Sequence, residues 1–162
     1  PAFDALRDAD LPELRGGHCI WFIGRVPEPD GGTRHAGPKY LALPGERPAL
    51  GQAWVTGRPE VLVCEGVFDW LAALARGLPA WSPCGTHFPA ASLGFLARAR
   101  RIYGVFDGDD AGRAASARFG AAIGGRYRAV ALPEGYDLSD LLRQPGGAAR
   151  FDALLAAARD GP

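Results

Sequence analysis

This 162-residue sequence carries no net charge, because 18 basic residues balance 18 acidic ones. That balance excludes a protein whose whole surface attracts nucleic acid, so any site for a polyanion must be a local patch. Lysine is also nearly absent, since Lys39 is the only one. The length and a hydrophobic fraction of 48% indicate a globular protein with one well-buried domain, or one domain with a small attachment.

Cysteine and histidine are scarce, with three of each. Cys19, Cys64 and Cys84 form no Cys-x-x-Cys pair, which argues against a disulfide framework and a zinc site and favours the reducing cytoplasm. No apolar stretch has the length of a membrane span and no signal peptide is visible, so we expect no membrane partner. The chain starts at Pro1 without a methionine, which leaves open whether it is a fragment of a longer protein.

Apolar runs alternate with helical patterns from about residue 60 onward. Val61-Leu-Val-Cys64 is a continuous apolar run, as in a strand buried on both faces, and helical spacing follows it as far as Gly77. The pattern predicts strands at residues 61–64, 80–82, 101–106 and 127–132. It predicts further helices at residues 90–99, 110–123, 138–143 and 148–159. Such alternation is typical of an α/β fold with a parallel sheet flanked by helices.

The first 57 residues have a different pattern. Residues 18–25 and 39–43 are rich in aromatic and β-branched side chains, and a turn-rich segment joins them, so they predict an antiparallel hairpin. Residues 44–57 are predicted to be irregular. We therefore expect a small β-rich segment at residues 1–57, an α/β domain at residues 58–145 and a C-terminal helix at residues 146–162.

The predicted strand at residues 101–106 runs directly into acidic residues. Gly108 leaves the backbone free to turn sharply, so Asp107 and Asp109 can present their carboxylates to one point. Oxygen ligands of this kind suit Mg²⁺ or Mn²⁺. The alternative is a solvated turn without a metal ion. For Asp110 we expect a structural role, as the cap of the helix that follows.

Two other predicted strands also end near acidic residues. Glu65 follows residues 61–64, and Asp137 follows residues 127–132. Parallel strands place their carboxyl ends at one edge of the sheet, so these two residues should converge with Asp107 and Asp109. At roughly 4 Å and an effective dielectric near 20, each pair of like charges costs about 4 kcal/mol. Divalent cations would offset that repulsion, and two of them could clamp a phosphate during phosphoryl transfer.

Three motifs resemble, in order and spacing, those of the Toprim domain of bacterial DnaG-type primases and their phage and plasmid relatives. They are Glu65-Gly-Val-Phe-Asp69, Asp107-Gly-Asp-Asp-Ala-Gly-Arg113 and Leu132-Pro-Glu-Gly-Tyr-Asp-Leu-Ser-Asp140. The resemblance is strong over residues 58–143. It extends more weakly to about residue 18, because Gly24-Arg25 and Pro38-Lys-Tyr-Leu41 look like the end of the primase N-terminal catalytic subdomain.

The resemblance implies a role for each matching residue. Glu65, Asp107, Asp109 and Asp137 would hold two Mg²⁺ or Mn²⁺ ions, with the first three catalytic. Asp69 and Asp140 are possible additional acids, and Asp69 could instead complement the helix dipole. Residues that would meet nucleotide or nucleic acid are Arg25, Lys39, Gly66, Thr86 and Arg113. Each of the three basic residues among them could equally be a surface charge.

Some features depart from the family. Many primases have Asp-Pro-Asp after the last strand, where this chain has Asp137-Leu-Ser139, and Asp140 comes one position later. It is open whether Asp140 compensates. A complete primase also has a zinc-binding module, a longer N-terminal catalytic subdomain and a helicase-binding tail, and these are not recognisable here. A replicative helicase partner would therefore bind through regions outside this chain.

The resemblance implies a cytoplasmic DNA primase-like nucleotidyltransferase that uses nucleoside triphosphates to build RNA primers on single-stranded DNA. One alternative is a metal-dependent DNA-cleaving Toprim enzyme of the topoisomerase or nuclease type. Topoisomerases need a tyrosine nucleophile, and no tyrosine here has a sequence context that suggests one. The other alternative is a non-catalytic Toprim module that binds nucleic acid.

Overall fold

A computed structural model describes residues 49–86, 88 and 90–161, except for the side chains of residues 90–92. In the first 48 residues it describes only the backbone of four short strands. The chain divides into two compact units, Pro1–Pro48 and Ala49–Pro162, which are described separately. None of the helices in the described ranges is long and apolar enough to cross a membrane.

The described backbone of the first unit forms two antiparallel pairs. Strands β1 (Leu14–Arg15) and β2 (His18–Cys19) form one pair, and β3 (Ile23–Arg25) and β4 (Tyr40–Ala42) form the other. The second pair agrees with the predicted hairpin. The single strand predicted at residues 18–25 instead contributes to both pairs. Lys39 lies outside the described residues.

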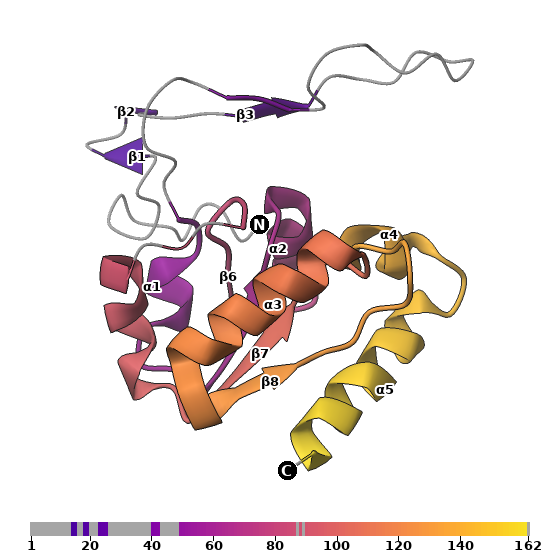
Figure 1. The fold of residues 1–162 in the computed structure, drawn as a ribbon. Helices are drawn as coiled ribbons and strands as arrows, with labels where there is room; N and C mark the ends of the chain where they lie inside the picture. Colours follow the sequence, from indigo (N-terminus) through magenta and orange to yellow (C-terminus); the bar gives the residue numbers. More distant parts are fainter. Residues whose placement is uncertain are drawn as a thin grey trace. The chain divides into compact units, whose positions relative to one another are not determined.

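The second unit is built on a four-stranded sheet in which all neighbouring strands are parallel (Figure 1). Its strands lie in the order β6-β5-β7-β8. Their bounds are Glu60–Cys64 for β5, Ala80–Trp81 for β6, Arg101–Val105 for β7 and Tyr127–Ala129 for β8. The predicted α/β fold with a parallel sheet is therefore confirmed.

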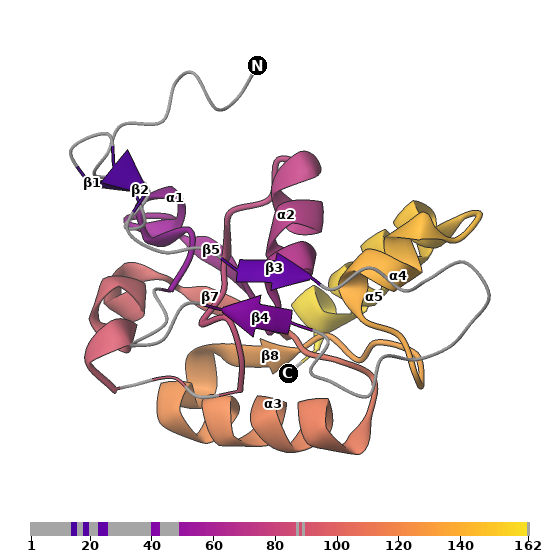
Figure 2. The ribbon, with the colours of Figure 1, turned by 90° about the horizontal axis from the view of Figure 1, so that it is seen from above.

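Helices cover both faces of this sheet, as Figure 2 shows, with α3 on one side of the strands and α2 and α4 on the other. The first layer comprises α1 (Gln52–Val55), the 3₁₀ helix η3 (Ala90–Arg98) and α3 (Asp110–Ile123). The second comprises α2 (Val67–Ala75), α4 (Leu138–Arg143) and α5 (Gly147–Asp160). A short 3₁₀ helix, η4 (Gly124–Arg126), leads from α3 into β8.

Phe119 of α3 is the centre of the core on the first face. Its ring contacts those of Trp81, Phe88, Phe106 and Tyr127, with centroids 4.8–6.3 Å apart. Side chains alternate between the faces of a strand, so Val61 and Val63 join this core while Leu62 faces the second layer. Large side chains that are fully buried elsewhere in this unit include Tyr103, Leu138, Leu141 and Phe151.

Two elements differ from the sequence-based expectations. The segment predicted to be irregular contains α1, a helix of only four residues that is too short to produce a periodic pattern. Gly51 starts it with φ +82°, where a side chain would strike Trp70 and the carbonyl oxygen of Ala80. Strand β8 is half as long as predicted. Ala129 pairs with Gly104, the penultimate residue of β7, so β7 offers little backbone beyond it.

Candidate metal centre at the carboxyl edge of the sheet

Backbone hydrogen bonds join the loops at the carboxyl edge, which is the edge where the parallel strands end. The amide of Gly85, after β6, donates to the carbonyl oxygen of Glu65, after β5, at 2.9 Å. The amide of Gly108, after β7, donates to the carbonyl oxygen of Tyr136, after β8, at 2.9 Å. The amide of Gly135 returns a bond to the Gly108 carbonyl at 3.1 Å. The segments that carry the four predicted ligands therefore share one edge.

Two glycines allow the close approach of these segments. A side chain on Gly108 would strike the backbone carbonyl of Pro133, and one on Gly112 would strike the backbone carbonyl of Asp107. Gly108 is not among the glycines with positive φ. The sequence-based reason for this glycine, freedom to turn, is therefore wrong. What the position requires is room for a neighbouring loop.

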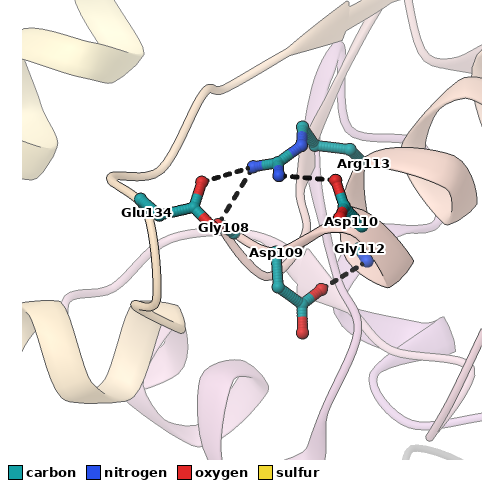
Figure 3. A network of polar contacts seen from close by, with 6 residues as sticks. All are labelled: Gly108, Asp109, Asp110, Gly112, Arg113 and Glu134. Atoms are coloured by element: carbon teal, nitrogen blue, oxygen red, sulfur yellow. Dashed lines mark hydrogen bonds and ion pairs between the residues drawn. The ribbon is translucent and has the colours of Figure 1, made fainter.

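Asp109 caps α3, and this corrects the expectation that Asp110 does so. One carboxylate oxygen of Asp109 accepts a hydrogen bond of 2.7 Å from the Gly112 amide, and its backbone is extended, as N-cap residues usually are (Figure 3). Asp110 is the first helical residue, and its exposed carboxylate lies 2.8 Å from Arg113. One carboxylate oxygen of Asp109 is thus held by the helix, while Figure 3 shows the other pointing away from Gly112.

Removing the cap should have a small effect on stability that depends on the replacement. In metal-free buffer, Asp109→Ala should lower the free energy of unfolding by about 0.5–2 kcal/mol, because the Gly112 amide loses its acceptor. Asp109→Asn keeps an acceptor and should stay within a few tenths of a kcal/mol of the parent. Urea unfolding measures both variants. Asp110→Ala is the matched control, and a greater loss there than in Asp109→Ala would contradict this assignment.

Asp137 caps α4 in the same way, with a bond of 2.6 Å from the amide of Asp140. The side chain of Asp140 is directed elsewhere, because its carboxylate lies 2.6 Å from Arg143. The amide of Ser139 donates to Asp69 at 2.9 Å, which joins the start of α4 to the start of α2. Asp140 itself is thus engaged with α4, whereas Asp69 is linked to the loop that carries Asp137.

Asp69 is the most deeply buried acid at this edge, with 6% of its surface exposed. Its pKa is raised to about 7, by burial first and then by the charges of Asp137 and Asp107, which together outweigh the lowering effect of hydrogen bonds from the backbone of Ser139 and Gly66. Burial also raises the pKa of Glu65, with added repulsion from Asp109 and Asp69. These carboxylates therefore lie close enough to repel one another, as expected of a site that is completed by cations.

The donor set fits a hard divalent cation. It consists of carboxylate oxygens, and the buried Oε2 atom of Glu65 has no hydrogen-bond partner within the described part of the chain. As they stand, however, no three acidic, histidine or cysteine side chains of the described ranges form a group that could hold a metal ion. An ion bound here would therefore take water molecules or phosphate oxygens as further ligands, unless these carboxylates move closer together.

The residues predicted to bind nucleotide or nucleic acid lie in several different elements. Gly66 is the N-cap of α2, and Thr86 is exposed in the loop after β6. Arg113 bridges two loops, since its guanidinium lies 2.9 Å from Glu134 and also donates to the Gly108 carbonyl at 3.1 Å (Figure 3). The side chain of Arg25 lies outside the described residues, as does all of Lys39.

Ser82 and Arg118 also shape the surroundings of Glu65, although no sequence pattern singled them out. Ser82 is fully buried, and its hydroxyl lies 3.1 Å from the Glu65 carbonyl oxygen while accepting a bond from the Cys84 amide. Cys84 has φ +57°, which is unusual for a residue other than glycine, so this turn carries backbone strain. The charge of Arg118 lowers the pKa of Glu65. Arg118 lies nine positions beyond Asp109, outside the acidic motif, so the spacing of the motif did not indicate it.

The fold is that of a known family. The model of the Toprim-like family matches residues 62–142, and the chain belongs to that family. One relative is the Gene 57 protein of Mycobacterium phage D29, which is 28% identical over 128 residues, covering 73% of this chain and 76% of the relative.

Solved structures of primases resemble this chain. A DNA primase domain from Pseudomonas aeruginosa is 29% identical with a TM-score of 0.68, covering 88% of this chain and 48% of that one. A DnaG primase catalytic domain bound to single-stranded DNA is 31% identical with a TM-score of 0.67, with the same coverage of both chains. The chain is therefore a Toprim domain that resembles DnaG catalytic cores, and it spans about half the length of these solved chains.

Proposed function

We propose that this chain is the catalytic Toprim portion of a DNA primase-like nucleotidyltransferase, which extends RNA primers on single-stranded DNA. The observation that carries the proposal is that Glu65, Asp107, Asp109 and Asp137 lie at one edge of the sheet, where burial and the charges of Asp109 and Asp69 raise the pKa of Glu65. The DnaG catalytic domain that it resembles was solved with single-stranded DNA bound. A helicase partner would bind through regions outside this chain, in the cytoplasm.

In the proposed reaction, a primer 3′-hydroxyl attacks the α-phosphorus of a nucleoside triphosphate, and pyrophosphate leaves. Glu65, Asp107, Asp109 and Asp137 would hold two Mg²⁺ or Mn²⁺ ions, which supply positive charge to the attacking and leaving oxygens. Glu65 offers its unpaired Oε2 either to such an ion or to the proton of the hydroxyl. Asp69 fixes the loop of Asp137 through the amide of Ser139.

Other residues of the chain would bind the nucleotide and the template. Gly66 and Thr86 lie in the loops after β5 and β6, where backbone amides and a hydroxyl can meet phosphate oxygens. Arg113 holds the loops after β7 and β8 together, and its half-exposed guanidinium could also meet a phosphate. Arg25 and Lys39 are proposed to contact the template.

Tyr103 and Tyr127 are poorly placed to act as the nucleophile of a topoisomerase-type enzyme. The hydroxyl of Tyr103 lies 3.2 Å from Glu60, at the start of β5 and thus at the far edge of the sheet from Glu65. The hydroxyl of Tyr127, at the start of β8, lies 2.6 Å from that of Ser116. Both side chains are therefore engaged away from the carboxyl edge, where a covalent nucleophile would be needed.

Incorporation of labelled nucleotides tests the proposal. The chain should add labelled ribonucleotides to an annealed RNA primer on single-stranded DNA, with Mg²⁺ or Mn²⁺, and the products should follow the template sequence. Asp107→Asn should remove this activity while leaving the melting temperature in metal-free buffer close to that of the parent. Nicking of supercoiled DNA by the parent without incorporation would instead support the cleaving enzyme. Absence of both activities would support the non-catalytic module.

A further inference from the structure

The amino edge of the sheet, where the strands begin, carries a group of basic residues that we call the arginine edge. It consists of Arg58, Arg98, Arg100, Arg101 and Arg126. The first four are exposed. They come from three segments that are distant in the sequence, namely the residues before β5, the end of η3 with the start of β7, and the residue before β8.

The backbone holds these segments together. The amides of Arg100 and Arg101 both donate to the carbonyl oxygen of Pro59, at 2.7 and 3.1 Å, which places them beside Arg58. The guanidinium of Arg126 donates to three carbonyl oxygens around the end of η3, at 2.8–3.1 Å. The positive charges are therefore brought together by the fold and do not belong to a single solvated run.

No carboxylate within the described part of the chain neutralises these charges. Four arginines elsewhere have carboxylate partners, namely Arg76, Arg113, Arg143 and Arg159. By contrast, the described residues provide no ion pair to any member of the arginine edge. Glu60, the acid at the start of β5, is paired with Arg159 at 2.9 Å. Uncompensated like charges repel, and an anionic ligand would remove that repulsion.

We infer that the arginine edge binds the sugar–phosphate backbone of single-stranded nucleic acid, an inference that rests on the proposed function. The acids of the carboxyl edge repel a polyanion, and the zero net charge of the chain requires that any attraction be local. Guanidinium groups match phosphate oxygens with two parallel hydrogen bonds. The exposed large apolar residues of the described ranges, Phe68 and Leu71, both lie on α2. The arginine edge thus lacks the apolar centre that a protein partner would need.

The test compares two triple variants at the same positions. Arg98→Gln, Arg100→Gln and Arg101→Gln together remove three charges, whereas the three corresponding Arg→Lys changes keep them. Binding of a fluorescent oligothymidine to the full chain is measured by anisotropy over a range of salt concentrations, without divalent ions. In the glutamine variant, the slope of log affinity against log salt should become less steep by about 2. At 0.1 M salt this variant should bind about 100-fold more weakly than the parent. The lysine variant should keep the parental slope.

Several outcomes would overturn the inference. A glutamine variant with the parental slope would do so, as would a parent that binds polyglutamate as tightly as DNA. Arg76→Gln, Arg143→Gln and Arg150→Gln together provide a control with the same change of net charge, and an equal loss of slope there would show a general charge effect only. Because the assay contains no metal ions and no nucleotides, its failure is separate from failure of nucleotide incorporation.

Discussion

Mn²⁺ at 100 times its dissociation constant is expected to raise the free energy of unfolding of this chain by about 2.7 kcal/mol. The physical reason is that the ion binds the folded arrangement of Glu65, Asp107, Asp109 and Asp137 and not the unfolded chain. At about 2–4 °C for each kcal/mol, the melting temperature should rise by about 5–11 °C. Thermal melts with and without Mn²⁺ measure the shift.

Asp109→Asn separates the negative charge of this residue from its role as the N-cap of α3. Asparagine is as good an N-cap as aspartate, so α3 keeps the bond from the Gly112 amide while the site loses one negative charge. The metal-free variant should be at least as stable as the parent, and the Mn²⁺ shift should largely disappear. Nucleotide incorporation should fall at least about 100-fold, because mutation of outer-shell partners of metal ligands already lowers metal affinity or activity by about 10–100-fold. A destabilised variant that keeps the full Mn²⁺ shift would show that Asp109 is structural.

The stability of the metal-free chain is expected to fall between about pH 4 and pH 7, chiefly because of Asp69. Its pKa is raised from 3.8 to about 7 by burial and by the charges of Asp137 and Asp107. The folded state therefore binds more protons than the unfolded state in this interval, so stability decreases as the pH rises and levels off above pH 7. Each unit of pKa difference corresponds to about 1.4 kcal/mol, so the decrease should amount to a few kcal/mol.

Asp69→Asn should remove most of that dependence. The amide oxygen of asparagine can still accept the bond from Ser139, but the buried charge is gone. At pH 8, in the presence of EDTA, the variant should be more stable than the parent by a few kcal/mol, whereas the two should be nearly equal at pH 4. Urea unfolding at both pH values gives the comparison, with Asp152→Asn on α5 as the exposed control. An equal loss of stability at both pH values would show that the hydrogen bonds of Asp69 outweigh its charge.

The elements that the sequence predicted best are helices that begin after a recognisable capping residue. The predicted bounds of α3 and α4 agree with the structure, because an aspartate precedes each helix and Gly124 follows the first. The prediction that the acids lie at one edge of the sheet followed from one property, the parallel direction of the strands. That property relates distant residues without any knowledge of their side-chain contacts.

What the sequence could not predict depends on tertiary contacts. Neighbouring aspartates compete for the cap of α3, and only the helix start decides that Asp109 takes it. The role of Gly108 depends on the carbonyl of Pro133, which is 25 positions away. The arginine edge likewise arises from three distant segments, joined by backbone hydrogen bonds to Pro59 and by the guanidinium of Arg126. No local pattern contains this information.

The early end of β8 has a consequence for motion. Beyond Val130 the chain leaves the sheet, and backbone bonds at Gly108 and the ion pair of Glu134 fasten the loop before Asp137 to its neighbour. Such a segment can shift at a far lower free-energy cost than a strand of the buried sheet. Asp137 therefore belongs to a loop outside the sheet, whereas Glu65 directly follows the buried strand β5. Adjustment of this loop would therefore be the less costly way to bring Asp137 closer to the other acids when a cation binds.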